Sequence, residues 1–200
     1  MRILLVGATG TIGKAVRSIL IERKHDVVSA GRHSGDKRVD MADPGQISGL
    51  YEQLAGIDAV AVAAGGSVFK PLEHLTVDDL DFTYRSKARG QLELVRQGLR
   101  HIPAAGSFTL VTGLLSREPV LGSTAVSFAN GAIEAFVRAA AIEMAPRRIN
   151  AVSPGVVAES EDDYDRDFPG IIPVPVAQVA AAYVRSIEGR DTGRIYTVGH

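Results

Sequence analysis

The chain contains no cysteine. Without this residue there can be no disulfide bond, no thiolate-ligated zinc, no iron–sulfur cluster and no thiol nucleophile. A charge imbalance is also lacking, because 22 basic and 23 acidic residues leave a formal net charge of −1. Since no overall field draws the protein to nucleic acid or to a membrane surface, we expect neither as a partner.

Long apolar runs are lacking as well. The apolar opening Ile3–Val6 is too short for the core of a signal peptide and leads directly into Gly7. No uninterrupted apolar stretch approaches the roughly 18 residues that a membrane helix needs. The sequence therefore predicts a protein without a targeting segment, and the cytoplasm is the expected location.

What the sequence does contain is an alternation of two kinds of segment over 200 residues. Short runs rich in β-branched residues predict buried strands at Arg2–Val6, Asp26–Ala30, Asp58–Ala63, Phe108–Thr112, Ile149–Val152 and Ile195–Val198. Between these runs the apolar residues recur at helical spacing, as in Ile47, Leu50, Tyr51 and Leu54. The pattern predicts one domain over residues 1–200, an α/β fold of the Rossmann type: a doubly wound parallel sheet with helices on both faces.

The most informative segment is the first strand and the turn that follows it. Gly7, Gly10 and Gly13 lie between the strand and a helical stripe. In this arrangement the three glycines permit a tight turn, a close approach of backbone to pyrophosphate, and close helix–strand packing, and the helix N-terminus attracts phosphate. We expect a dinucleotide to bind here, with Gly7, Thr9, Gly10, Thr11, Ile12 and Gly13 as its contacts. The alternative is a glycine-rich turn without a ligand.

The end of the second predicted strand indicates which dinucleotide binds. An NAD site usually has an acidic residue there, whereas this chain has Gly31 followed by Arg32 and Ser34. A guanidinium group can pair with a 2′-phosphate through two charge-assisted hydrogen bonds, and Ser34 offers a hydroxyl. The sequence predicts NADP(H) in preference to NAD(H), unless Arg32 is only a solvated loop residue.

Three segments together resemble the short-chain dehydrogenase/reductase family: the glycine loop, AAGG at residues 63–66, and NAVSPGVV at residues 150–157. The resemblance covers nearly the whole chain, and its glycine spacing is that of the extended and atypical members. It implies that Asp40 lies near the adenine and that Ala63, Ala64 and Gly65 line the adenosine side. It also implies that Pro154, Gly155 and Val156 lie beside the nicotinamide.

The family's catalytic pattern is changed at each matching position. Where the family has a tyrosine followed by a lysine, this chain has Val126 and Asn130, and the serine position falls on Gly113, next to Thr112. The supporting asparagine of the family corresponds to Lys87. No catalytic residue is therefore assigned; Thr112, Lys87 and Asn130 are the candidates, and no metal site is expected.

Two tyrosines could substitute for the missing one. Tyr84 lies one helical turn from Lys87, and Tyr164 lies in an acidic loop that could cover a nicotinamide. The simpler interpretation of both is a surface aromatic residue.

Two functions remain open at this point. The first is an NADP(H)-binding oxidoreductase that acts on an unknown small substrate by an atypical mechanism. The second is a catalytically inactive protein that senses NADP(H) or binds another protein. The helices expected at about Val77–Arg100 and Gly122–Ala145 resemble those that pair subunits in the family, which implies a homodimer or homotetramer.

Overall fold

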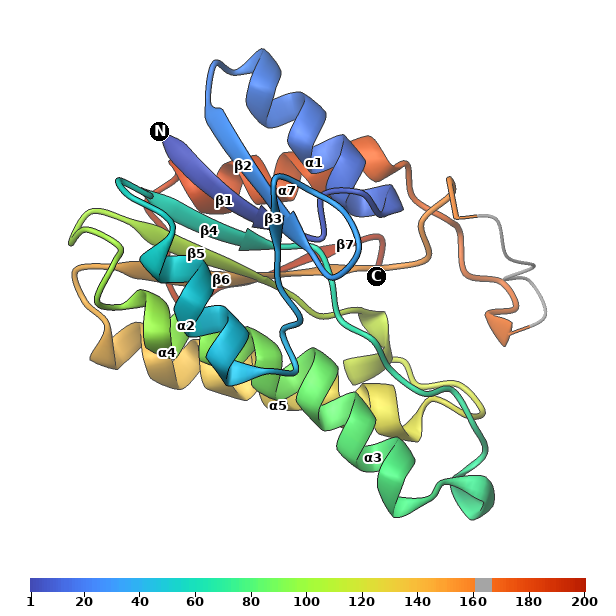
Figure 1. The fold of residues 1–200 in the computed structure, drawn as a ribbon. Helices are drawn as coiled ribbons and strands as arrows, with labels where there is room; N and C mark the ends of the chain where they lie inside the picture. Colours follow the sequence, from blue (N-terminus) through green and yellow to red (C-terminus); the bar gives the residue numbers. More distant parts are fainter. Residues whose placement is uncertain (161–166) are drawn as a thin grey trace.

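The computed structural model describes residues 1–160 and 167–200. Its centre is a sheet of seven parallel strands in the order β3-β2-β1-β4-β5-β6-β7 (Figure 1). The strands are β1 (Arg2–Val6), β2 (Asp26–Gly31), β3 (Lys37–Arg38), β4 (Ala59–Val62), β5 (Ser107–Val111), β6 (Arg148–Pro154) and β7 (Ile195–Val198). This topology confirms the predicted doubly wound parallel sheet.

Helices cover both faces of the sheet. Figure 1 shows α1 and α7 on one face, and α2, α4 and α5 on the other. The helices are α1 (Thr11–Glu22), α2 (Pro44–Glu52), α3 (Val77–Thr83), α4 (Gly90–Gly98), α5 (Thr124–Glu143) and α7 (Val176–Glu188). Shorter turns are η1 (Leu72–His74), η2 (Tyr84–Arg89) and η3 (Leu114–Ser116). Each face has its own hydrophobic core, because side chains alternate across a strand.

The register of the central strands places their carboxyl ends at one edge. Val6 of β1 pairs with Ala30 of β2 on one side and with Val62 of β4 on the other. The glycine turn after β1 and the AAGG segment after β4 therefore start side by side. This is the edge where a ligand binds in a doubly wound fold.

The connection between β2 and β3 is short, and residues 32–36 form no helix. The chain turns back at the carboxyl edge, so that Lys37 pairs with Ala30 and Arg38 with Gly31. Periodicity did not predict β3, because a strand of two residues has no apolar pattern. The turn keeps residues 32–34 next to the glycine loop.

The long helix expected at about Val77–Arg100 is present but not regular. Its middle, η2, is a π-helical segment between α3 and α4. Such segments occur often at functional sites. Lys87, one of the candidate catalytic residues, lies within η2 and is buried.

The other long helix, α5, is the one helix in the described part of the chain that is long and apolar enough to cross a membrane. Only 44% of its most apolar window is buried within the structure. Its buried side chains, such as Ile133 and Val137, belong to the core against the sheet. The composition of α5 is thus that of a core helix packed on a sheet.

Candidate functional site

The turn after β1 has no room for side chains at two of its glycines. Gly7 has φ +89°, and a Cβ there would lie 2.6 Å from the Ala63 carbonyl oxygen. A Cβ at Gly13 would lie 1.9 Å from the Gly7 carbonyl oxygen. At Gly10 the nearest atom would be 3.8 Å away, so that position is open. The first and third glycines are required by packing, and the second leaves a free space above the turn.

The amino end of α1 is the second element of the site. Gly10 is its N-cap and has no side chain with which to accept hydrogen bonds. By contrast, Asp43 caps α2, and Thr76 forms a capping box with Asp79 at α3. The first N–H groups of a helix carry the positive end of its dipole. Because no N-cap side chain engages them in α1, they can bind phosphate oxygens.

A cleft of about 400 Å³ lies over this turn. Of the residues predicted from the sequence, it is lined by Gly7, Thr9, Gly10, Arg32, Ser34, Asp40, Ala63, Ala64 and Gly65. Thr11, Ile12 and Gly13 form the first turn of α1 behind it. The glycine loop, the end of β2 and the AAGG segment thus meet around one cavity.

One end of the cleft carries a polar cluster. The Thr9 and Ser34 hydroxyls are 2.8 Å apart, which ties the glycine loop to the segment after β2. The Arg32 Nε donates to His33 Nε2 at 2.9 Å. Within the described residues no carboxylate pairs with Arg32, so its terminal N–H groups are available to a ligand. No sequence pattern indicated His33, whose ring nitrogen accepts at the Nε edge of the guanidinium group.

Two aspartates support this region. The Asp36 carboxylate accepts hydrogen bonds from the Ser29 hydroxyl at 2.6 Å and the Ser29 backbone N–H at 2.9 Å. These hydrogen bonds lower the pKa of Asp36 below its ordinary value, so the turn is held by a carboxylate at neutral pH. Asp40 lines the cleft, and one of its oxygens accepts from the Ala42 N–H at 2.9 Å.

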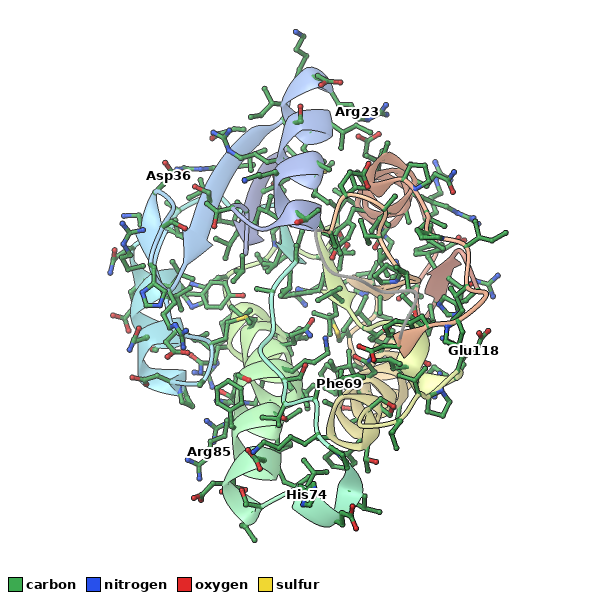
Figure 2. The ribbon with its side chains drawn as sticks, turned by 90° about the vertical axis from the view of Figure 1, so that its right-hand side faces the viewer. Arg23, Asp36, Phe69, His74, Arg85 and Glu118 are labelled. Carbon is green, nitrogen blue, oxygen red and sulfur yellow. The ribbon has the colours of Figure 1, made fainter. Side chains whose placement is uncertain are left out.

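Pro154, Gly155 and Val156 do not line this cleft. Pro154 is the last residue of β6, and Gly155 packs against Gly199 directly after it. Val156 belongs to a small buried cluster with Leu114 and Phe168. Figure 2 looks towards the carboxyl edge and shows Asp36 on one side and Glu118 on the opposite side, with Phe69 between the helices below. The cleft therefore occupies the half of the carboxyl edge at which β1, β2 and β4 end, and the segment after β6 lies at the other half.

The three candidate catalytic residues lie in different surroundings. The Thr112 hydroxyl is buried and directed within the protein, towards Glu134 Oε1 at 3.4 Å and the Val152 carbonyl at 3.5 Å. Asn130 is buried and donates to the Gly113 carbonyl at 3.4 Å. Lys87 is buried, and within the described residues its ammonium group has no hydrogen-bond or ion-pair partner. Thr112 is thus the weakest of the three candidates.

Of the two alternative tyrosines, Tyr84 belongs to the described residues. It is 41% exposed, and no hydrogen bond joins it to Lys87 there. Tyr164 lies outside the described residues. Val126, at the position expected for a tyrosine, is buried in α5 and has no ionisable group.

An ion pair that no sequence pattern indicated lies at the far half of the edge. Arg117 and Glu134 form two parallel hydrogen bonds of 3.0 and 2.9 Å, and Ser116 donates to the same carboxylate at 2.7 Å. Glu134 is buried on a face of α5 that is otherwise mainly apolar. An acidic residue on that face was the only signal, and Arg117 lies 17 residues away in the sequence. This pair anchors the segment after β5 to α5.

A parallel doubly wound sheet with an uncapped helix end and a glycine turn at its carboxyl edge defines a nucleotide-binding α/β protein. Residues 19–188 match the model of a family described as Enoyl-(Acyl carrier protein) reductase. The chain belongs to the short-chain dehydrogenase/reductase family, whose members are oxidoreductases with a nicotinamide cofactor.

Two curated relatives are similar over most of their length. A short-chain dehydrogenase/reductase, ucsE, from Acremonium sp is 27% identical over 191 residues. The match covers 78% of this chain and 72% of that protein. Versicolorin reductase stcU from Emericella nidulans is 29% identical over 179 residues, covering 77% and 68%.

Solved structures show the same fold. The protein lin1944 from Listeria innocua is 45% identical, with a TM-score of 0.96 and 99% of each chain covered. A small-chain dehydrogenase in complex with NADPH is 27% identical, with a TM-score of 0.88, and the match covers 99% of this chain and 96% of that one.

Proposed function

We propose that the chain is an NADP(H)-dependent oxidoreductase that acts on a small substrate without the family's usual tyrosine. The observation that supports this proposal is the cleft itself. It has an uncapped helix end for a pyrophosphate at one position and, for a 2′-phosphate at another, the guanidinium group of Arg32, which no carboxylate of the described residues pairs with. The solved NADPH complex of a relative with the same fold agrees with this choice of cofactor. When bound, NADPH would supply a hydride to the substrate.

The substitution Gly10→Ala tests the phosphate site without disturbing the fold. Gly10 has φ −74° and ψ 172°, which alanine adopts freely, and its added methyl group meets no atom of the protein within 3.5 Å. The methyl group would instead occupy the space of the pyrophosphate. We expect the Kd for NADPH, measured by fluorescence titration, to rise by roughly 10- to 100-fold, the equivalent of one charge-assisted hydrogen bond.

The matched control is Gly49→Ala in α2, where an added methyl group also meets nothing within 4 Å. Both variants should keep the wild-type melting temperature or exceed it slightly. The control should bind NADPH as tightly as the wild type. Wild-type affinity in Gly10→Ala would mean that no phosphate lies over this turn, and failure of the wild type to bind NADPH would refute the proposed function.

One observation favours a second function, a cofactor sensor without catalysis. At the position that the sequence resemblance assigns to the family's tyrosine, this chain has Val126, which has no proton to give. Incubation of the protein with NADPH and a panel of aldehydes, quinones and flavins, followed at the nicotinamide absorbance band, separates the two functions. Tight binding of NADPH without turnover of any of these compounds would favour the sensor.

We also propose that the protein forms a homodimer or homotetramer. Exposed apolar side chains occur on both long helical segments, among them Val77 and Leu80 on α3 and Phe128 and Ile142 on α5. Pairing these helices between two copies would bury these side chains. Light scattering on the purified protein should therefore give at least twice the mass of the chain, and a monomeric mass would contradict the proposal.

A further inference from the structure

Two polar groups at the carboxyl edge have no hydrogen-bond or ion-pair partner in the described structure. One is the ammonium group of Lys87, a residue that is only 8% exposed but whose Nζ atom is still reached by solvent. The other is the Oδ1 atom of Asn130, which is shielded from solvent and accepts no hydrogen bond. A buried acceptor without a hydrogen bond is unfavourable, and so is a largely buried ammonium group without a counter-charge. These two groups in neighbouring elements therefore call for a functional explanation.

The position of Lys87 follows from the contacts of a neighbour on the same helix. Gln91, one turn further along the helix, accepts from the Val111 N–H at 2.8 Å and donates to the Val111 carbonyl at 2.9 Å. Val111 is the last residue of β5. Lys87 and Gln91 share a helix face, because they are four residues apart. The helix runs from the carboxyl edge of the sheet towards its amino edge, so the earlier residue, Lys87, lies just beyond the end of β5. This is the edge at which the ligand cleft lies.

Lys87 is also adjacent to the wall of that cleft. Gly65 lines the cleft, and a Cβ at Gly65 would lie 3.0 Å from Lys87 Cγ. The absence of a side chain at Gly65 lets the lysine pass close behind the cleft wall. Ser86, the residue before Lys87, lines the cleft directly.

Asn130 approaches the same region from α5. Its Nδ2 donates to the Gly113 carbonyl, and a Cβ at Gly113 would lie 3.4 Å from Nδ2 and 3.7 Å from the Pro154 carbonyl oxygen. The carboxamide therefore lies where the ends of β5 and β6 meet. Since η2 packs against α5, the lysine and the asparagine project from facing helices.

We propose that Lys87 is the proton donor of this enzyme: its ammonium group, oriented by the Asn130 carboxamide oxygen, protonates the oxygen of an aldehyde or ketone as the carbonyl carbon is reduced. Lys87 is then a catalytic residue, and Asn130 is a positioning residue. The proposal rests on the proposed function, because NADPH must supply the hydride.

The chemistry balances with these groups alone. The hydride from NADPH forms the new C–H bond, and the electron pair of the C=O π bond takes a proton from Lys87 Nζ to form the O–H bond. The carbonyl is reduced to an alcohol, NADPH is oxidised to NADP⁺, and the neutral amine of Lys87 regains its proton from solvent.

The electrostatic surroundings suit this role. Burial lowers the pKa of Lys87 to about 8, and no neighbouring charge contributes to the shift. An acid with a pKa near the working pH is the most effective proton donor. The charged groups on the elements packed against η2 are Asp78, Asp79 and Asp81 on α3, Glu93 and Arg96 on α4, and Glu134, Arg138 and Glu143 on α5.

Most of those charges are already paired with one another or with other residues: Asp79 with Lys70, Asp81 with Arg85, Glu93 with Arg96, and Glu134 with Arg117 and Arg138. On η2 itself, Arg89 donates to the Ala42 carbonyl. Other hydroxyls near the edge are engaged too, since Ser116 donates to Glu134 and to the Gly113 carbonyl. Lys87 is thus an ionisable group beside the cleft whose ammonium has neither a hydrogen bond nor an ion pair within the described residues.

The first test measures the lysine without turnover. Trace acetylation of the protein between pH 6 and 11, quantified by mass spectrometry of the Lys87 peptide, gives the pKa of this group. We expect about 8, protection from acetylation by NADP⁺, and an upward shift in Asn130→Asp, because a carboxylate beside the ammonium favours the charged form. An unshifted value near 10.5, with no effect of NADP⁺, would overturn the proposal.

The second test uses Lys87→Met with 4-nitrobenzaldehyde and menadione as probes. Loss of general acid catalysis should lower kcat for the aldehyde at least 100-fold, whereas reduction of the quinone, whose anionic product needs no protein acid, should change less than 3-fold. The wild-type rate with the aldehyde should fall as the pH rises through 8, and the variant should lose this dependence. Methionine replaces a buried charge with an apolar chain, so the variant should fold at least as stably.

The controls separate this proposal from the proposed function. Lys24→Met removes an exposed lysine beyond the far end of α1 and should behave as the wild type. If Lys87→Met binds NADPH and reduces the aldehyde at the wild-type rate with the wild-type pH profile, Lys87 is not the donor, although the oxidoreductase function stands. If the wild type does not bind NADPH, the proposed function itself is wrong.

Discussion

Gly13→Ala is expected to lower the melting temperature by roughly 6–12 °C and to abolish measurable NADPH binding. The added methyl carbon would lie 1.9 Å from the Gly7 carbonyl oxygen and 2.9 Å from Ala8 Cα, and both are backbone atoms. Backbone cannot move aside as a flexible side chain can, so α1 must shift away from the turn after β1. Overpacking of this kind costs about 3 kcal/mol at the upper end of its usual range, which corresponds to that change in Tm for a chain of this size.

The same shift would destroy the phosphate site, because the turn and the amino end of α1 are the two parts that hold it. Calorimetry and NADPH titration of the purified variant measure both effects. Gly131→Ala is the matched control, since Gly131 lies within α5 and an added methyl group there meets nothing within 4 Å. That variant should gain up to about 1 kcal/mol from helix propensity. A Gly13→Ala protein with wild-type Tm would mean that the turn is looser than the structure shows.

The glycine turn also shows why much of the fold could be predicted from the sequence. The order strand, turn, helix is encoded within residues 2–22, and each local preference agrees with the final structure. The same holds for α2, where Ile47, Leu50 and Tyr51 follow the helical period and all three are buried. Strands covered on both faces, such as β4, are apolar at every position and are easily found.

The features that the sequence did not reveal depend on contacts between distant residues. β3 has two residues and exists only because β2 offers an edge. The pairing of Arg117 with Glu134 joins the segment after β5 to α5, and no local pattern announces it. The burial of Lys87 follows from the packing of η2 between the AAGG segment and α5. At the sequence level Lys87 was one candidate among three, and only its surroundings distinguish it.

The cofactor preference gives the other large effect, since Arg32→Ala should weaken NADPH binding by roughly 10- to 100-fold and leave NADH binding unchanged. A guanidinium–phosphate pair contributes about 1.5–3 kcal/mol, and only NADPH has the 2′-phosphate. The His33 ring accepts from Arg32 Nε, which leaves the two terminal nitrogens for the ligand. Paired titrations with NADPH and NADH, by fluorescence or by thermal shift, measure the ratio of the two affinities directly.

Arg38→Ala is the matched control for this prediction. Arg38 lies on the neighbouring β3, donates to the Gly35 carbonyl at 3.2 Å and does not line the cleft. Removing its charge lowers the local positive potential as Arg32→Ala does, but it takes no direct contact from the ligand. If both variants weaken NADPH binding equally, the preference comes from the general field of this edge. If only Arg32→Ala loses the preference, the 2′-phosphate is bound by the guanidinium group that the turn after β2 holds beside Thr9 and Ser34.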